Sequence, residues 1–183
     1  MDNHTMEFPA TEREINNWWT FESSVILQNH SVLVPEAQDR TGAVLLAKET
    51  PPETKDHFLV DAIVKIGNKD KTDKGGTGMA LHYLSDFNHQ DIGSGLFGYS
   101  YKFKGIAIYL NTLMTKKVGE EDQHYIQLFY NDGESMINPL SAASMHEERS
   151  CMRNLRNKKS VYLRLEYNGK SLKVDTFDME NSN

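Results

Sequence analysis

Three groups of residues in this sequence have the types and spacing of a binding site. Glycines surround Thr77 in the run Gly75–Gly78, which suits either a phosphate cradle or a tight turn or bulge. No helix is predicted after this run, which favours the turn or bulge. The run of carboxylates Glu120-Glu121-Asp122 predicts a solvated loop; the alternative is that these carboxylates bind a metal ion weakly. A basic run favours a solvated or partner-facing loop over a phosphate site; it comprises Arg149, Arg153, Arg156, Lys158 and Lys159.

No arrangement typical of an enzyme accompanies these groups. Glycoside hydrolysis needs two carboxyl groups that face each other across the substrate, and the sequence has no Glu-x-Asp-x-Glu strand motif. We also find no Ser-His-Asp triad pattern and no metal-ligand constellation. The sequence therefore predicts a protein that is not an enzyme.

The elements that position these groups are predicted to be strands. Phe58–Ile66 alternates apolar and polar residues, but Leu59 and Ile63 interrupt its polar face. This pattern predicts a strand that is covered on one side and partly on the other. The alternation in Val161–Tyr167 continues after Asn168-Gly169, which predicts a hairpin with a two-residue type I′ turn.

Further short strands with glycine and proline turns between them favour a β-sandwich, and no segment shows a helical apolar stripe. The predicted strands are Val25–Leu27, Ser31–Val34, Ala43–Ala47, Met79–Leu84, Gly105–Asn111 and Gln123–Tyr130.

Length and composition fit one globular domain, with 183 residues, 38% of them hydrophobic and 25% charged. The net charge of −6 disfavours nucleic acid as a partner, because neutralising phosphates needs a basic face. No apolar run has the length of a membrane span, and the first residues lack a signal-peptide core. Residues 1–12 are predicted to be a flexible tail, and residues 13–183 to form the domain.

Two segments, Gly75–Tyr83 and Gly105–Thr112, resemble the core strands of the L-type (leguminous) lectins, in the branch that carries glycoproteins out of the endoplasmic reticulum. The resemblance covers roughly residues 18 to 177. It implies an all-β, concanavalin-like jelly-roll sandwich of two antiparallel sheets, located in the lumen of the secretory pathway. Other features that follow the family's order are Trp18-Trp19, Ser31–Thr41, Phe58–Ile66, Asn131-Asp132-Gly133, Cys151 and Arg156-Asn157.

The single cysteine, Cys151, cannot form an internal disulfide bond. The resemblance implies that it pairs with a second cysteine shortly after the hairpin that ends near Phe177. The sequence stops at Asn183, before that partner and before the family's final strands. Cys151 is therefore either a free thiol in a shortened protein or half of a disulfide in a piece of a longer one. The sheet edges that missing strands would expose favour the second interpretation.

The resemblance also implies a calcium site. The family supplies an Asp at the place of Asn111, the carbonyl of Leu113, an Asn at the place of Thr115, and an Asp at the place of Ala142 when the loop is counted without gaps. Calcium takes six to eight oxygens, and several usually come from carboxylates. Both carboxylates are replaced here, so the sequence predicts that calcium is lost and that no cofactor or metal is bound.

The sugar contacts that the resemblance implies are replaced as well. An Asp of the family corresponds to Thr77, which keeps one possible hydrogen bond, and a His corresponds to Pro139, whose side chain makes none. The alternative is that Asp132 or Glu134 substitutes as a calcium ligand if the loop is aligned differently. The carbohydrate-binding positions predicted to be degenerate are Thr77, Asn111, Thr115 and Pro139.

Two functions remain open. The first is a lectin-like scaffold or protein-interaction module with a degenerate calcium and mannose site, which implies a protein partner or a larger assembly. The alternative is a divergent carbohydrate-binding lectin that acts as a glycoprotein cargo receptor in the early secretory pathway, with a glycan as its ligand.

Overall fold

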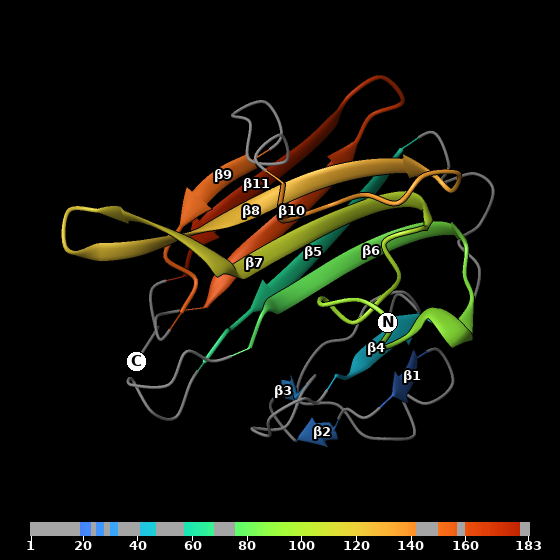
Figure 1. Ribbon diagram of the computed structural model, residues 1–183, viewed down its shortest axis with the longest axis horizontal. Coiled ribbons are helices and arrows are strands. Elements are labelled where there is room, and N and C mark those ends of the chain that lie inside the picture. The colour runs from blue at the N-terminus through green and yellow to red at the C-terminus, as the bar shows by residue number, and fades with distance from the viewer. Residues whose placement is uncertain are drawn as a thin grey trace. The chain divides into compact units, whose positions relative to one another are not determined.

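The computed structural model describes residues 19–22, 25–27, 30–32, 41–46, 57–67, 76–141, 150–156 and 160–179. Within these ranges the regular structure consists of eleven β-strands and one short 3₁₀ helix (Figure 1). The described residues contain no helix long and apolar enough to cross a membrane. The chain divides into two compact units, residues 1–54 and 55–183.

The first unit contains two small antiparallel sheets. In one, β1 (Trp19–Glu22) pairs with β4 (Ala43–Leu46). In the other, β2 (Val25–Leu27) pairs with β3 (His30–Val32). The strands predicted near residues 25, 31 and 43 are confirmed, whereas β1 was not predicted.

The second unit contains a four-stranded antiparallel sheet with the strand order β6-β7-β8-β9. Its strands are β6 (Gly78–Asp86), β7 (Lys104–Val118), β8 (Glu121–Asp132) and β9 (Ser150–Arg153). Cys151 lies in β9 and forms no disulfide bond within the described part of the chain.

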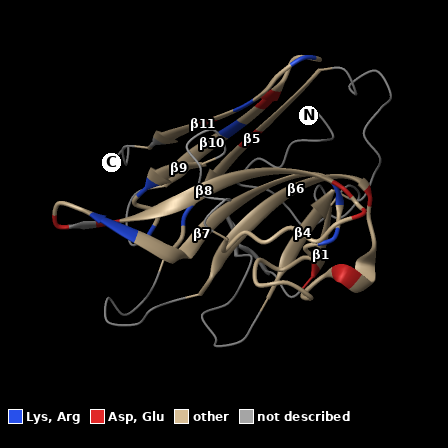
Figure 2. Cartoon of the chain, turned by 45° about the horizontal axis from the view of Figure 1, so that its top comes forward, with Lys and Arg blue, Asp and Glu red and all other residues tan. Residues whose placement is uncertain are grey.

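The other sheet of this unit has three antiparallel strands in the order β11-β10-β5. They are β5 (Phe58–Val64), β10 (Val161–Tyr167) and β11 (Leu172–Asp178). Figure 2 shows the two sheets as separate layers. The strand predicted over Phe58–Ile66 is confirmed to Val64, and Leu59 and Ile63 project outward, 53% and 62% exposed.

The main core lies between the two sheets. Ile108, Leu110 and Ile126 of the four-stranded sheet belong to the same buried cluster as Leu163 and Leu165 of β10. β10 contributes leucines to this cluster because its sequence alternates: the leucines face the core, and the residues between them are at least partly exposed. Burying this apolar surface is the dominant favourable term for the sandwich.

A second core lies on the opposite face of the four-stranded sheet. There, Phe97, Tyr99 and Phe103 of the segment before β7 pack with Ala107 and Tyr109. The sheet is therefore covered on both faces in the middle of β7, where residues 107–110 are completely buried. This explains why β7 has a continuous apolar run in place of a polar alternation.

The hairpin between β10 and β11 is confirmed, but the predicted two-residue turn is wrong. Tyr167 pairs with Leu172, so four residues lie in the loop. The side-chain oxygen Oδ1 of Asn168 accepts hydrogen bonds from the backbone N–H groups of Lys170 (3.1 Å) and Ser171 (2.9 Å). This local bonding by Asn stabilises the wider loop.

Candidate functional site

The residues predicted from the sequence meet at one end of the four-stranded sheet. Thr77 directly precedes β6, and the register of the sheet places Gly78 opposite Asn111 of β7. The backbone N–H of Thr112 donates to the carbonyl of Thr77 at 3.0 Å. Pro139 lies in the turn after β8 and is buried. The structure therefore brings Thr77 close to Asn111, and Gln127 links Pro139 to Asn111.

Gly78 makes this arrangement possible. Its φ of +127° lies in a region that favours glycine, and an added Cβ would lie 2.0 Å from the carbonyl oxygen of Leu110. Gly78 pairs with Asn111 inside β6, so here the glycine permits a close approach to the backbone of Leu110, and neither a turn nor a bulge is seen at this position. Gly75 lies outside the described residues.

A large bulge in β7 follows Asn111. Asn111 pairs with Tyr125, and the next pairing joins Thr115 to His124, so three residues of β7 have no residue opposite them. The side chain of Asn111 organises the bulge, because its Oδ1 accepts hydrogen bonds from the backbone N–H groups of Leu113 (3.1 Å) and Met114 (3.2 Å). Leu113 is 53% exposed as a result.

The amide group of Asn111 also begins a buried hydrogen-bond network. Its Nδ2 donates to Oε1 of Gln127 at 3.0 Å, and Nε2 of Gln127 donates to the carbonyl of Pro139 at 2.8 Å. Asn111 and Gln127 are both 0% exposed. Both the donor and the acceptor of the Asn111 amide are thus used within the protein, as buried polar groups require.

Within the described residues, Thr115 and Thr77 form no hydrogen bond with this network. Thr115 lies beyond the bulge and is exposed, opposite His124. Ala142 lies outside the described residues. Thr77 uses its hydroxyl to donate to the carbonyl of Leu96.

Sequence reasoning missed Gln127 and misjudged part of the basic run. Arg156 is not a solvated residue, because its Nη2 donates to the carbonyl of Gly76 and, at 2.9 Å, to Oγ1 of Thr112. Arg153 donates to the carbonyl of Thr176 at 3.0 Å. These contacts join segments that lie far apart in the sequence, so local composition carries no signal for them.

A half-buried histidine, His82, and a buried one, His124, occupy the same sheet. His82 is half-buried, and its ring packs with those of Tyr99, Phe103 and Tyr109 at centroid distances of 5.2, 5.4 and 5.7 Å. Burial lowers the pKa of His82 to about 4. Among the described residues, neither Nε2 of His82 nor the Tyr109 hydroxyl has a hydrogen-bond partner.

His124 is the second. Its Nδ1 accepts a hydrogen bond from the backbone N–H of Leu155 at 3.1 Å, which requires that nitrogen to be unprotonated. Burial, with a further contribution from the charge of Arg156, lowers the pKa of His124.

The carboxylates Glu120 and Asp122 lie at the β7–β8 turn and are exposed. Within the described ranges no three His, Cys, Asp or Glu side chains are grouped so that they could hold a metal ion.

Comparison with known proteins identifies the lineage of this arrangement. The sequence model of the legume-like lectin family matches residues 2–183. The chain belongs to this family. It is 27% identical to the vesicular integral-membrane protein VIP36 of Canis lupus familiaris over 167 residues, and 26% identical to that of Homo sapiens. Both matches cover 90% of this chain and 45% of the relative, so the chain spans less than half the length of these curated relatives.

Solved structures of this lectin family share the fold. The VIP36 exoplasmic/lumenal domain superposes with a TM-score of 0.75 in its metal-free form (18% identity) and in its Ca2+/Man-bound form (20% identity). These matches cover all of this chain and 76% and 74% of those domains. The Emp47p carbohydrate recognition domain gives a TM-score of 0.67 at 16% identity, covering all of this chain and 81% of that domain.

These findings confirm two predictions from the sequence. The chain is a divergent L-type lectin domain of the branch of ER–Golgi cargo-receptor lectins, and its fold is the all-β jelly-roll sandwich of that family.

Proposed function

We propose that this legume-like lectin domain has a degenerate calcium and mannose site and acts as a non-enzymatic scaffold or protein-interaction module. The observation that carries the proposal is the buried Asn111 amide, whose oxygen accepts from Leu113 and Met114 and whose Nδ2 donates to Gln127. An oxygen that already accepts two backbone N–H groups would have to give them up to coordinate an ion.

The other residues at the family's calcium positions do not fit the ion either. Leu113 offers a carbonyl and Thr115 a hydroxyl, so the described positions carry no ionised ligand. Calcium is held by six to eight oxygens, with carboxylates compensating for the loss of its water. A neutral and incomplete donor set supports the loss of the metal, and we assign calcium no role in this domain.

The sugar positions support the same conclusion. The hydroxyl of Thr77 is used by Leu96, and the carbonyl of Pro139 accepts from Gln127. Specific recognition of a sugar needs several placed donors and acceptors. We infer that Thr77, Asn111, Thr115 and Pro139 no longer form the family's mannose site.

The alternative, a divergent carbohydrate-binding cargo receptor, is at least as well supported by the relatives. VIP36 is a vesicular integral-membrane protein, and its lumenal domain has a Ca2+/Man-bound form. The same relationship favours the ER or Golgi lumen for this chain. We retain residues 13–183 as the proposed lectin-like domain, with residues 1–12 as a tail.

Titration calorimetry with calcium and high-mannose glycan tests the proposal. We expect no heat of calcium binding and no calcium-dependent binding of the glycan. The VIP36 lumenal domain serves as the positive control. Micromolar calcium binding that strengthens glycan binding would overturn the proposal in favour of the cargo-receptor alternative. A glycan array without calcium then separates a redesigned sugar site from a scaffold.

A further inference from the structure

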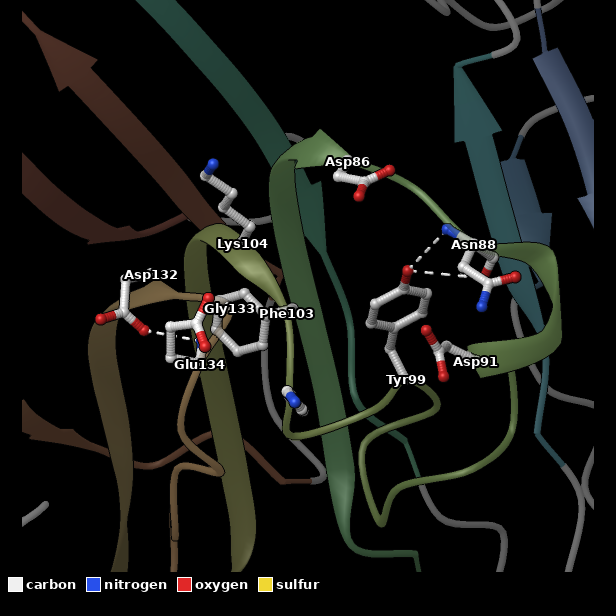
Figure 3. A pocket seen from close by; sticks show the side chains of 10 residues that line it. Asp86, Asn88, Asp91, Tyr99, Phe103, Lys104, Asp132, Gly133 and Glu134 are labelled. Carbon is white, nitrogen blue, oxygen red and sulfur yellow. Dashed lines mark hydrogen bonds between the residues drawn. The ribbon is translucent and has the colours of Figure 1, made fainter.

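A second candidate site lies at the opposite end of the four-stranded sheet. A pocket of about 410 Å³ opens there between the end of β6, the start of β7 and the turn after β8 (Figure 3). Lys104 begins β7 and Asn111 follows seven residues later, so the two regions are roughly 23 Å apart along an extended strand. We call this region the charged pocket; its ionisable carboxylates and amines are Asp86, Asp91, Asp132, Glu134, Lys102 and Lys104.

Hydrogen bonds fix one wall of the charged pocket. Oδ1 of Asn88 accepts from the backbone N–H of Gln90 at 3.1 Å and caps the 3₁₀ helix His89–Asp91. The backbone N–H of Asn88 donates to the hydroxyl of Tyr99 at 3.0 Å. Figure 3 shows Asp86, Asn88, Asp91 and Tyr99 together on this side.

The opposite wall is fixed in a similar way. Oδ1 of Asp132 accepts from the backbone N–H of Glu134 at 2.8 Å. Gly133 has a φ of +89°, and a Cβ there would lie 3.2 Å from Cβ of Lys104. Nδ2 of the buried Asn131 donates to the carbonyl of Ser135 at 2.8 Å and secures the turn. Both walls are therefore held by hydrogen bonds; one of these uses Oδ1 of Asp132, whereas no side-chain hydrogen bond of the other charged residues is seen among the described residues.

Among the described residues, the charged groups of the pocket form no ion pair with one another. Within the described residues, the ion pairs are Arg164–Asp61 and Lys173–Asp175, and neither involves the pocket. Four carboxylates disfavour an anionic ligand, whereas two ammonium groups disfavour a simple cation. A neutral ligand with many hydroxyl groups uses both kinds, since hydroxyls donate to carboxylates and accept from amines.

We infer that the charged pocket is a calcium-independent binding site for a saccharide. Its volume lies within the range of about 300–1,000 Å³ that small-molecule sites occupy. The site adds a ligand to the domain, and it stands whether or not the positions around Asn111 are degenerate.

Chemical-shift mapping of the ¹⁵N-labelled full chain in EDTA tests this inference. The probes are methyl α-mannoside, methyl β-glucoside, methyl β-galactoside and methyl N-acetyl-β-glucosaminide, with tetralysine as a charged competitor class. We expect at least one glycoside to shift the backbone amides of Asn88, Lys102 and Gly133 saturably, with those of Thr77 and Leu113 unchanged.

Variants separate a specific site from general effects. Asp86→Asn and Lys104→Gln should each weaken the binding of that glycoside at least about tenfold, because each removes a charged hydrogen-bond partner. Glu166→Gln, which changes an exposed carboxylate of β10, is the matched control and should leave binding unchanged.

Three results would overturn the inference: no glycoside shifts the pocket amides, shifts occur only at Thr77 and Leu113, or only tetralysine binds. The last result would assign the pocket to a basic protein partner. A calcium-dependent shift at Thr77 would instead contradict the proposed loss of the family site, so the two failures are distinguishable.

Discussion

At the Asn111 end of the four-stranded sheet, the polar groups bond to the protein itself, whereas at the Lys104 end they surround a pocket. The amide of Asn111 uses its donor and its acceptor on Gln127 and on the backbone of the bulge. At the other end, carboxylates and ammonium groups line a pocket and form no ion pairs among the described residues. The difference shows that polar residues at a strand end mark a ligand site only where the fold leaves their bonding capacity unused.

The largest effect on stability is expected at the Asn111 end of the four-stranded sheet. Gly78→Val places a β-branched residue at positive φ, with its Cβ against the carbonyl oxygen of Leu110. We expect a loss of about 4 kcal/mol or more in the free energy of unfolding, measured by urea denaturation. Gly67→Val is the control, because a Cβ there meets nothing within 4 Å. Equal stability of the two variants would contradict the packing described for β6 and β7.

His82, which lies in β6 between the Asn111 end and the charged pocket, predicts that the free energy of unfolding falls in acid. The pKa of His82 is about 4 in the folded chain and near 6.5 when unfolded, so its contribution is complete above pH 6.5 and is lost as the pH falls toward 4. We expect His82→Phe to abolish about 3 kcal/mol of this loss in denaturation at pH 7.5 and pH 4. His124, whose pKa is also lowered, leaves a residual dependence of the same sign. An unchanged pH profile in the variant would show that His82 does not titrate in this way.

The substitution Asn111→Asp tests whether the hydrogen bonds at the Asn111 end of the sheet exclude calcium. The carboxylate still accepts from Leu113 and Met114 but cannot donate to Gln127. We expect a loss of about 2 kcal/mol in stability, and millimolar calcium should not restore it because the second family carboxylate is absent. A rise in melting temperature with calcium would show that one substitution reopens the site.

The smallest effects on stability are expected at the charged pocket. Asp86→Asn removes an exposed carboxylate that has no ion-pair partner among the described residues, so its effect should stay within about 0.5 kcal/mol. A loss of 2 kcal/mol in the same denaturation assay would show that the charges of the pocket stabilise the fold and are not available to a ligand.

Much of the fold was predictable because alternation and turn residues act locally. The Phe58–Val64 strand and the β10–β11 hairpin follow from period-two patterns. The sequence missed β9 and the outer part of the β7–β8 hairpin, where polar residues such as Lys116 and Lys117 pair in a ribbon without an apolar face. It also missed the wider loop at Asn168, which a side-chain hydrogen bond selects.

The candidate site was predictable in position but not in chemistry. The register of β6 and β7 places Thr77 next to Asn111, whereas the pattern around Gln127 predicts only a strand. Arg156 reaches Gly76 across 80 residues of sequence, a contact that no local pattern indicates. The charged pocket is assembled from three separate segments and therefore left no motif.

The most direct test of the account follows the side-chain amide signals of Asn111 and Gln127 by NMR during a calcium titration to 10-fold excess. If the network between these residues closes the family's calcium position, both signals stay unchanged throughout. A saturable shift of the Asn111 amide would mean that its oxygen leaves the bulge for the ion, and would contradict the account.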